Sequence, residues 1–265
     1  MTDTRYFTTG DGCRIAYRLE GAEGLPVLVL SNSIATNLTM WDGQVAELAR
    51  SFRVLRYDFR GHGDSYAPVG AYSLDRLGHD VLEMLDSLRI ARVHFCGLSL
   101  GGFVGQWLGI HAPERIERLI LSNTAPHLGP ASYFDEQIRK VLTAADMLDT
   151  ADLFMRNWFP DSMLDGRNEI VAEFRTGVRT TSPVGLAGCY AAVRDCDLRR
   201  TISLITAPTL VIGGEDDKVT LASHSEAIAA AIPGAKLTLL AGVHMLNVER
   251  PVEFMGAVMG FLGEI

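Results

Sequence analysis

Cysteine is scarce in this chain and shows no functional spacing. The 265 residues contain four cysteines, Cys13, Cys96, Cys189 and Cys196, and none of them forms a C-x-x-C pair. Such a scatter argues against a disulfide framework and is typical of a protein in a reducing compartment. The first residues contain no apolar run of the kind found in secretory leaders. We therefore expect a cytoplasmic protein.

A surplus of positive charge is also missing. Lysine and arginine total 24 against 32 aspartates and glutamates, so the formal net charge is -8. A chain of that charge is not expected to bind nucleic acid or an anionic membrane, and no apolar run approaches the length of a membrane span. No G-x-G-x-x-G follows the first apolar strand, and histidine and cysteine show no ligand spacing. The sequence thus predicts neither a dinucleotide cofactor nor a metal site.

The chain does contain a regular alternation of apolar runs and amphipathic stretches. The continuous apolar runs at 27–30 and 93–96 are typical of strands buried on both faces of a parallel sheet. Between 126 and 195 the strand signal disappears and helical patterns remain. We predict an α/β fold with a mostly parallel sheet flanked by helices. Residues 1–125 and 196–265 are expected to form its core, and residues 126–195 an inserted helical lid.

The segment Gly97-Leu98-Ser99-Leu100-Gly101 lies between one of these strands and a helical run. G-x-S-x-G in that context is typical of a nucleophile elbow, where a sharp strand-to-helix turn exposes the serine above the sheet. Side chains at the flanking positions would collide, which explains the two glycines. The pattern alone is common by chance, so its meaning depends on other residues. A nucleophilic serine needs a base beside it and an acid that orients the base.

Two later strands end in residues that can supply the base and the acid. His244 combines a position after Ser99 in the chain with the carboxyl end of a strand. The first strand after the helical insertion ends in a loop with three acids, where a G-x-x-D pattern selects Asp217 and leaves Asp216 as the alternative. The carboxyl ends of parallel strands meet at one edge of the sheet. We therefore predict a catalytic triad of Ser99, Asp217 and His244.

Acyl transfer also needs backbone donors for the oxyanion. The N–H group of Leu100 opens the helix behind the elbow and can face a developing negative charge. A second donor is expected from the loop after an early central strand, which here begins Ser31-Asn32-Ser33. We predict that the backbone N–H groups of Ser33 and Leu100 form the oxyanion hole.

With these residues placed, nearly the whole chain resembles the α/β-hydrolase superfamily. The segment Asp58–Ser65 resembles the loop that many of these enzymes carry before the nucleophile, and Glu249-Arg250-Pro251 after His244 resembles their C-terminal signature. One departure is Ser31-Asn32, where most members have His-Gly.

That departure and several further segments resemble 3-oxoadipate enol-lactonase. These segments are Met40-Trp41-Asp42, Asn157-Trp158-Phe159 and residues 188–195. The resemblance implies cofactor-free hydrolysis of 3-oxoadipate enol-lactone, a small lactone with a free carboxylate, in bacterial degradation of aromatic compounds. Trp158 is a candidate residue in the wall of the substrate pocket. The candidate cations for the substrate carboxylate are the lid residues Arg139, Arg156, Arg179 and Arg194.

Two other functions are compatible with the same residues. One is a general carboxylesterase or a cofactor-free perhydrolase that uses the same triad. The other is a ligand-binding receptor on a hydrolase fold, against which the intact triad argues. The sequence predicts no oligomeric state.

Overall fold

In this computed structural model, one sheet positions the candidate residues Ser99, Asp217 and His244. The structure describes residues 3–165 and 167–263. In this part of the chain, eight strands form one sheet in the order β1-β2-β4-β3-β5-β6-β7-β8. The strands are β1 (Arg5–Thr8), β2 (Arg14–Glu20), β3 (Val27–Ser31), β4 (Arg53–Tyr57), β5 (Val93–Leu98), β6 (Ile116–Ser122), β7 (Thr209–Gly214) and β8 (Lys236–Leu240).

The helices and short 3-10 turns connect these strands. The helices are α1 (Asp42–Leu48), α2 (Leu74–Ser87), α3 (Leu100–His111), α4 (Ala131–Thr143), α5 (Leu148–Trp158), α6 (Glu169–Thr180), α7 (Pro183–Arg194), α8 (Ala222–Ala231), α9 (Leu246–Glu249) and α10 (Pro251–Leu262). The 3-10 turns are η1 (Leu38–Trp41), η2 (Pro113–Arg115), η3 (Asp161–Met163) and η4 (Ile202–Leu204).

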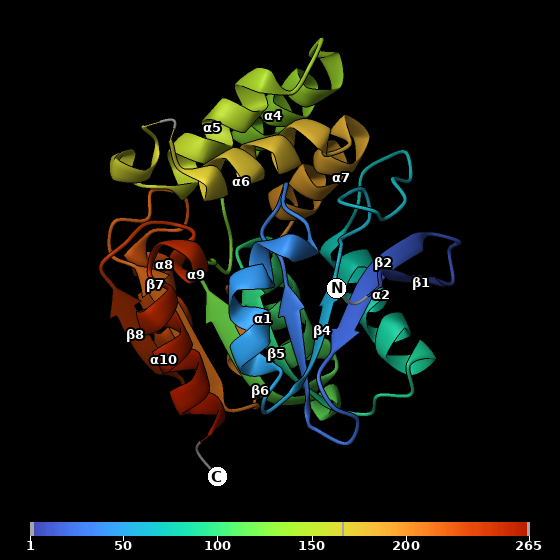
Figure 1. Ribbon diagram of the computed structural model, residues 1–265, viewed down its shortest axis with the longest axis vertical. Coiled ribbons are helices and arrows are strands. Elements are labelled where there is room, and N and C mark those ends of the chain that lie inside the picture. Colours follow the sequence, from blue (N-terminus) through green and yellow to red (C-terminus); the bar gives the residue numbers. More distant parts are fainter. Residues whose placement is uncertain (1–2, 166, 264–265) are drawn as a thin grey trace.

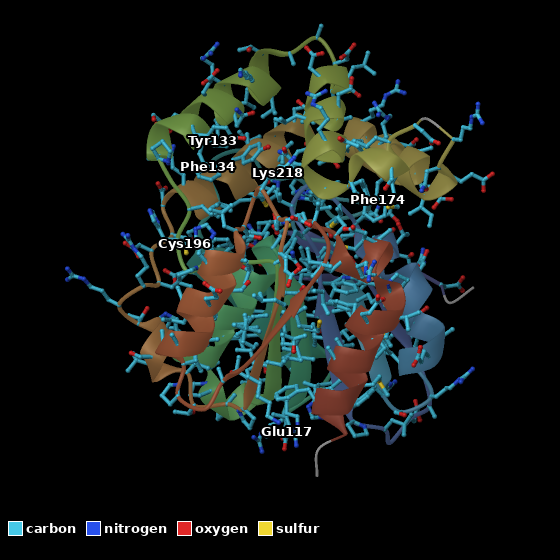
Figure 2. The ribbon with its side chains drawn as sticks, turned by 90° about the vertical axis from the view of Figure 1, so that its left-hand side faces the viewer. Glu117, Tyr133, Phe134, Phe174, Cys196 and Lys218 are labelled. Carbon is cyan, nitrogen blue, oxygen red and sulfur yellow. The ribbon has the colours of Figure 1, made fainter. Side chains whose placement is uncertain are left out.

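The sheet is antiparallel only at one edge. β1 pairs with β2, and β2 with β4, in antiparallel register, whereas β4, β3, β5, β6, β7 and β8 pair in parallel. Consecutive parallel strands need crossover connections, and the helices between them supply these. Figure 1 shows α1 and α10 in front of the sheet, and the side view in Figure 2 shows α8 covering the opposite face. The predicted α/β fold with a mostly parallel sheet is confirmed.

The four helices α4 to α7 form a separate layer above the sheet (Figure 1). α4 packs on α7 and α5 packs on α6, so this layer has its own helix–helix contacts. It covers the edge at which the parallel strands end, where the loops after β5, β7 and β8 carry Ser99, Asp217 and His244. The predicted division of the chain at 126–195 stays a prediction, and residues 1–2, 166 and 264–265 of the predicted ranges lie outside the described residues.

Within residues 3–165 and 167–263, no helix is both long and apolar enough to cross a bilayer. The same residues contain no group of three or more His, Cys, Asp or Glu side chains that could hold a metal ion.

Candidate active site

Ser99 occupies a strained turn between β5 and α3. Its backbone has φ 56° and ψ -114°, a conformation that non-glycine residues rarely adopt. A Cβ atom on Gly97 would overlap the carbonyl oxygen of Gly101, and one on Gly101 would overlap that of Ser31. The Ser99 N–H donates to Ser122 O at 3.0 Å, which ties the turn to β6. Close backbone approach therefore explains the two glycines, as the sequence predicted.

His244 and Asp217 form a buried pair beside this turn. His244 Nδ1 lies 2.8 Å from Asp217 Oδ2, and both side chains are almost fully buried. His244 Nε2 is also buried and has no hydrogen-bond partner among the described residues. A buried polar atom without a partner costs about 1–3 kcal/mol, so this nitrogen is not placed for stability. The structure brings together the base and the acid that the sequence selected.

Four hydrogen bonds besides that of His244 hold the Asp217 carboxylate. Oδ1 accepts the N–H groups of Val219 and Thr220 at 2.8 and 3.1 Å. Oδ2 accepts Thr220 Oγ1–H at 2.7 Å and Asn123 Nδ2–H at 2.9 Å. Burial acts to raise the pKa of Asp217, but the charge of His244 and the hydrogen bonds from His244, Asn123 and Thr220 outweigh it and hold this pKa well below its usual range. The carboxylate is therefore ionised at neutral pH.

Asn123 and Thr220 were not selected from the sequence. Asn123 directly follows β6, at the same edge of the sheet as the other candidates, and this position was an available signal. Its φ of 43° directs a polar side chain into the core beside Asp217. Thr220 lies three residues after Asp217 and bonds back to it. The alternative acid, Asp216, is exposed, and only its backbone N–H is engaged, with Gly242 O at 3.0 Å.

A cavity of about 370 Å³ lies between the sheet edge and the helical layer. Ser99, Leu100 and His244 line it from the core, and Trp158 lines it from α5. Ligand sites in proteins typically enclose about 300–1,000 Å³, so this cavity is large enough for a small molecule. Most of its remaining wall is apolar or aromatic: Ile34, Phe103, Leu128, Gly129, Tyr133, Phe134, Leu153, Phe154, Tyr190, Val193 and Val219, together with the polar Asn157 and Lys218.

The backbone donors at the cavity differ in part from those expected. The Leu100 N–H has no partner among the described residues, whereas the N–H of Gly101 bonds to Asn32 O at 2.9 Å. The Ser33 N–H donates to Met40 Sδ at 3.3 Å, and Ser33 does not line the cavity. Its neighbour Ile34 does line the cavity, and no hydrogen bond of the Ile34 N–H is present in the described structure. Of these two residues, Ile34 therefore presents an N–H group without a partner at the cavity, and the role predicted for the Ser33 N–H stays a prediction.

Comparisons with known proteins agree with this architecture. The sequence profile of the alpha/beta hydrolase fold family matches residues 26–251. The chain is an α/β-hydrolase. It is 36% identical to 3-oxoadipate enol-lactonase 2 of Acinetobacter baylyi over 94% of this chain and 93% of the relative. It is 31% identical to RutD of Pseudomonas savastanoi pv. phaseolicola, provisionally described as a carbamate hydrolase, over 89% of this chain and 93% of the relative.

Solved structures are similar over nearly the full length of this α/β-hydrolase. A hydrolase from Pseudomonas aeruginosa PA01 has a TM-score of 0.97 at 56% identity, with 98% of each chain covered. The enol-lactonase from Burkholderia xenovorans LB400 has a TM-score of 0.95 at 38% identity, with 98% of this chain and 100% of the other covered.

The four arginines named as candidates for the substrate carboxylate do not line the cavity of the α/β-hydrolase. Arg139, Arg156 and Arg179 are exposed, and none of them lies in its wall. Arg194 is held by Asp135 and Asp195, at 2.7 and 2.8 Å. The sequence offered these four arginines only as candidates for the substrate carboxylate, and none of them lines the cavity.

The loop after β4 carries three buried ionisable side chains outside the cavity, Asp58, Arg60 and His62. The Asp58 carboxylate accepts the N–H groups of Leu38 and Asp64 at 2.6 and 2.8 Å. Burial nevertheless raises the pKa of Asp58 from 3.8 to about 6. His62 is fully buried, its Nδ1 lies 3.2 Å from Arg60 O, and burial lowers the pKa of His62 from 6.5 to about 4. The loop therefore buries an acid and a base that resist ionisation in the same pH range.

These shifts predict opposite pH slopes of stability in two variants. The folded state disfavours protonated His62, so its contribution is present above pH 6.5 and is lost as the pH falls towards 4. The folded state favours protonated Asp58, so its contribution is present below pH 3.8 and is lost as the pH rises through 6. In wild type the two effects oppose each other. With two pKa units at about 1.4 kcal/mol each, each effect is worth about 3 kcal/mol.

The measurement is urea unfolding of wild type, His62→Asn and Asp58→Asn between pH 4 and pH 6.5. Relative to wild type, His62→Asn should gain stability as the pH falls, and Asp58→Asn should gain stability as the pH rises. Other titrating groups are common to all three proteins and cancel in the differences. Profiles that stay parallel to wild type would show that neither group titrates abnormally in the folded state.

Proposed function

We propose that this α/β-hydrolase opens 3-oxoadipate enol-lactone to 3-oxoadipate, in bacterial breakdown of aromatic compounds. The observation that carries the chemistry is the buried Asp217–His244 pair, whose unpartnered Nε2 belongs to the same cavity as Ser99. The observation that supports the substrate is the likeness to enol-lactonases at 36% and 38% identity over nearly the whole chain.

The first chemical step forms an acyl-enzyme. His244 Nε2 accepts the proton of the Ser99 hydroxyl while Oγ attacks the lactone carbonyl. Asp217 keeps the Nδ1 proton in place and stabilises the imidazolium that forms. Collapse of the tetrahedral intermediate breaks the ring C–O bond and expels an enolate. The enolate takes the proton from His244 and tautomerises to the ketone, and it remains attached because the ester was cyclic.

The second step releases the product. His244 takes a proton from a water molecule, and the resulting hydroxide attacks the acyl ester of Ser99. The new carboxylate leaves, and His244 returns the proton to Ser99 Oγ. In both steps the oxyanion would be bound by the N–H groups of Leu100 and Ile34, which have no other partner in the described structure. A single such donor contributes about 3–4 kcal/mol to the transition state.

The layer α4 to α7 would act as the lid of this site. Trp158, Phe154 and Tyr190 come from this layer and lie on the cavity wall. Their apolar surfaces would exclude bulk water from the acyl-enzyme and limit the size of the substrate. In this proposal, residues 126–195 determine which substrates the site accepts.

Initial rates on a substrate panel test the proposed activity. We expect kcat/KM for 3-oxoadipate enol-lactone to exceed the values for 4-nitrophenyl acetate and for a simple aryl carbamate by about 100-fold or more. A higher value on the aryl ester would identify a general esterase, and peracid formation from acetate and hydrogen peroxide would identify a perhydrolase. A higher value on the carbamate would favour the activity named for RutD. Tight lactone binding without turnover would indicate a receptor.

A further inference from the structure

The wall of the Ser99 cavity is unusual in its charge. Among the described residues that line it, Lys218 is the one lysine or arginine, and no aspartate or glutamate is present. The whole chain has a net charge of -8, whereas the charge contributed by Lys218 to this wall is positive. A second cavity of about 620 Å³ contacts α6 and α1 and has the opposite character, since Asp42 and Glu173 line it without any lysine or arginine.

Lys218 lies in a loop whose backbone is held by the triad acid. The N–H groups of Val219 and Thr220 both bond to Asp217 Oδ1, so the residues directly after Lys218 have a fixed position. The Lys218 side chain forms no ion pair or hydrogen bond with another described residue. Figure 2 shows it between the sheet edge and the helical layer, near Tyr133 and Phe134, which line the same cavity. Its ammonium group is therefore available to a ligand.

The other cations considered for this role are excluded by position or by pairing. Arg139, Arg156 and Arg179 are absent from the cavity wall, whereas Lys218 lines it although it is also exposed to solvent. Arg194 is paired with two aspartates. Two polar side chains of the wall, Tyr133 and Asn157, form no hydrogen bond with other described residues and come from α4 and α5. A carboxylate at Lys218 would thus have further donors on the facing helices.

We propose that Lys218 forms an anion subsite that binds the carboxylate of the substrate remote from the bond that is cleaved. The inference rests on the proposed function and adds a specificity-determining residue to it. An anionic ester or lactone gains a charged contact in the cavity, and its neutral analogue does not. The cleaved product carries two carboxylates, one at Lys218 and one newly formed at Ser99.

The test compares Lys218→Met with wild type on charged and neutral members of a substrate pair. The pairs are the enol-lactone with the methyl ester of its carboxylate, and 4-nitrophenyl hydrogen glutarate with its methyl ester. For the anionic member we expect KM to rise about 10-fold, which corresponds to about 1.4 kcal/mol, with kcat nearly unchanged. For the neutral member we expect KM to stay the same. Lys218→Arg should restore most of the affinity for the anion, because it restores the charge.

Salt and a surface control separate a local contact from a general charge effect. Raising NaCl from about 0.02 to 0.5 M should increase KM of wild type for the anionic member and leave Lys218→Met almost unaffected. Lys140→Met removes the same charge from α4 at a residue outside the cavity wall, where Lys140 pairs with Glu136, and should behave as wild type.

Binding without turnover keeps this inference distinct from the proposed reaction. Calorimetry with adipate, a dicarboxylate that cannot react, should show affinity for wild type that falls about 10-fold in Lys218→Met, while adipamide binds both proteins equally. Loss of adipate binding in a protein inactive on the enol-lactone would support the subsite and reject the lactonase. Unchanged KM and unchanged adipate affinity in Lys218→Met would overturn the subsite even if the lactone is hydrolysed.

Discussion

Ser99→Ala should lower kcat on the enol-lactone by about 10⁶-fold while the protein stays folded. In the proposed mechanism the hydroxyl oxygen forms the acyl-enzyme, and no other described side chain of the cavity wall is a serine, threonine or cysteine. Alanine removes this oxygen and retains the Cβ atom, so the strained backbone at φ 56° remains as it was. The loss should therefore appear in turnover and not in the unfolding transition.

The measurement combines steady-state rates with thermal unfolding. Ser203→Ala is the matched control, because Ser203 is exposed and lies outside the cavity wall. It should retain wild-type kcat and Tm. Rapid mixing of wild type with a 4-nitrophenyl ester should release a burst of nitrophenol if deacylation is slow, and Ser99→Ala should release none. Substantial turnover by Ser99→Ala would reject the acyl-enzyme mechanism.

Asp217→Asn should lower kcat by about 10⁴-fold, and Asp216→Asn should leave it nearly unchanged. Asp217 accepts hydrogen bonds from His244, Asn123, Val219 and Thr220. An amide NH₂ group in place of Oδ2 would donate to His244 Nδ1 and move the ring proton to Nε2, where it blocks the acceptance of the Ser99 proton. Asp216 is exposed, and its side chain forms no hydrogen bond with His244 or Thr220 in the described structure.

Because both variants remove one negative charge from the same loop, their comparison isolates the hydrogen bond to His244. Each variant should be measured as kcat and KM over the pH range in which wild type is active. Equal losses in the two variants would mean that the charge of the loop, and not the orientation of His244, supports catalysis. A loss of kcat in Asp216→Asn alone would show that Asp216, the alternative acid, supports His244.

The fold and the acid–base pair were predictable because they follow from chain order and strand ends. Parallel strands place their carboxyl ends at one edge, so His244 and Asp217 could be expected near Ser99 from spacing alone. The collision at Gly97 is likewise local, since it involves the backbone of Gly101 in the same turn, whereas the collision at Gly101 involves Ser31 at the end of β3. The fold and the acid–base pair thus depend on only a few contacts between residues that are far apart in the sequence.

The remaining features depend on contacts that no local pattern reveals. The Ser33 N–H is engaged by Met40 Sδ, a contact that decides which amide of this loop is free. Asn123 reaches Asp217 across 94 positions of the sequence. Lys218 was part of the acidic loop already selected, yet its place in the cavity wall depends on how α4 and α5 pack above it.

The division between core loops and helical layer also governs how this enzyme could diversify. In the proposed mechanism, proton transfer depends on Ser99, Asp217 and His244, whereas most of the aromatic wall comes from α4, α5 and α7. Mutations in that layer can change the specificity for the apolar part of a substrate without altering the residues of proton transfer. Lys218 lies outside that layer, in the loop that carries Asp217. If the proposed subsite is right, a change from anionic to neutral substrates requires a mutation in this loop of the core and not in the helical layer.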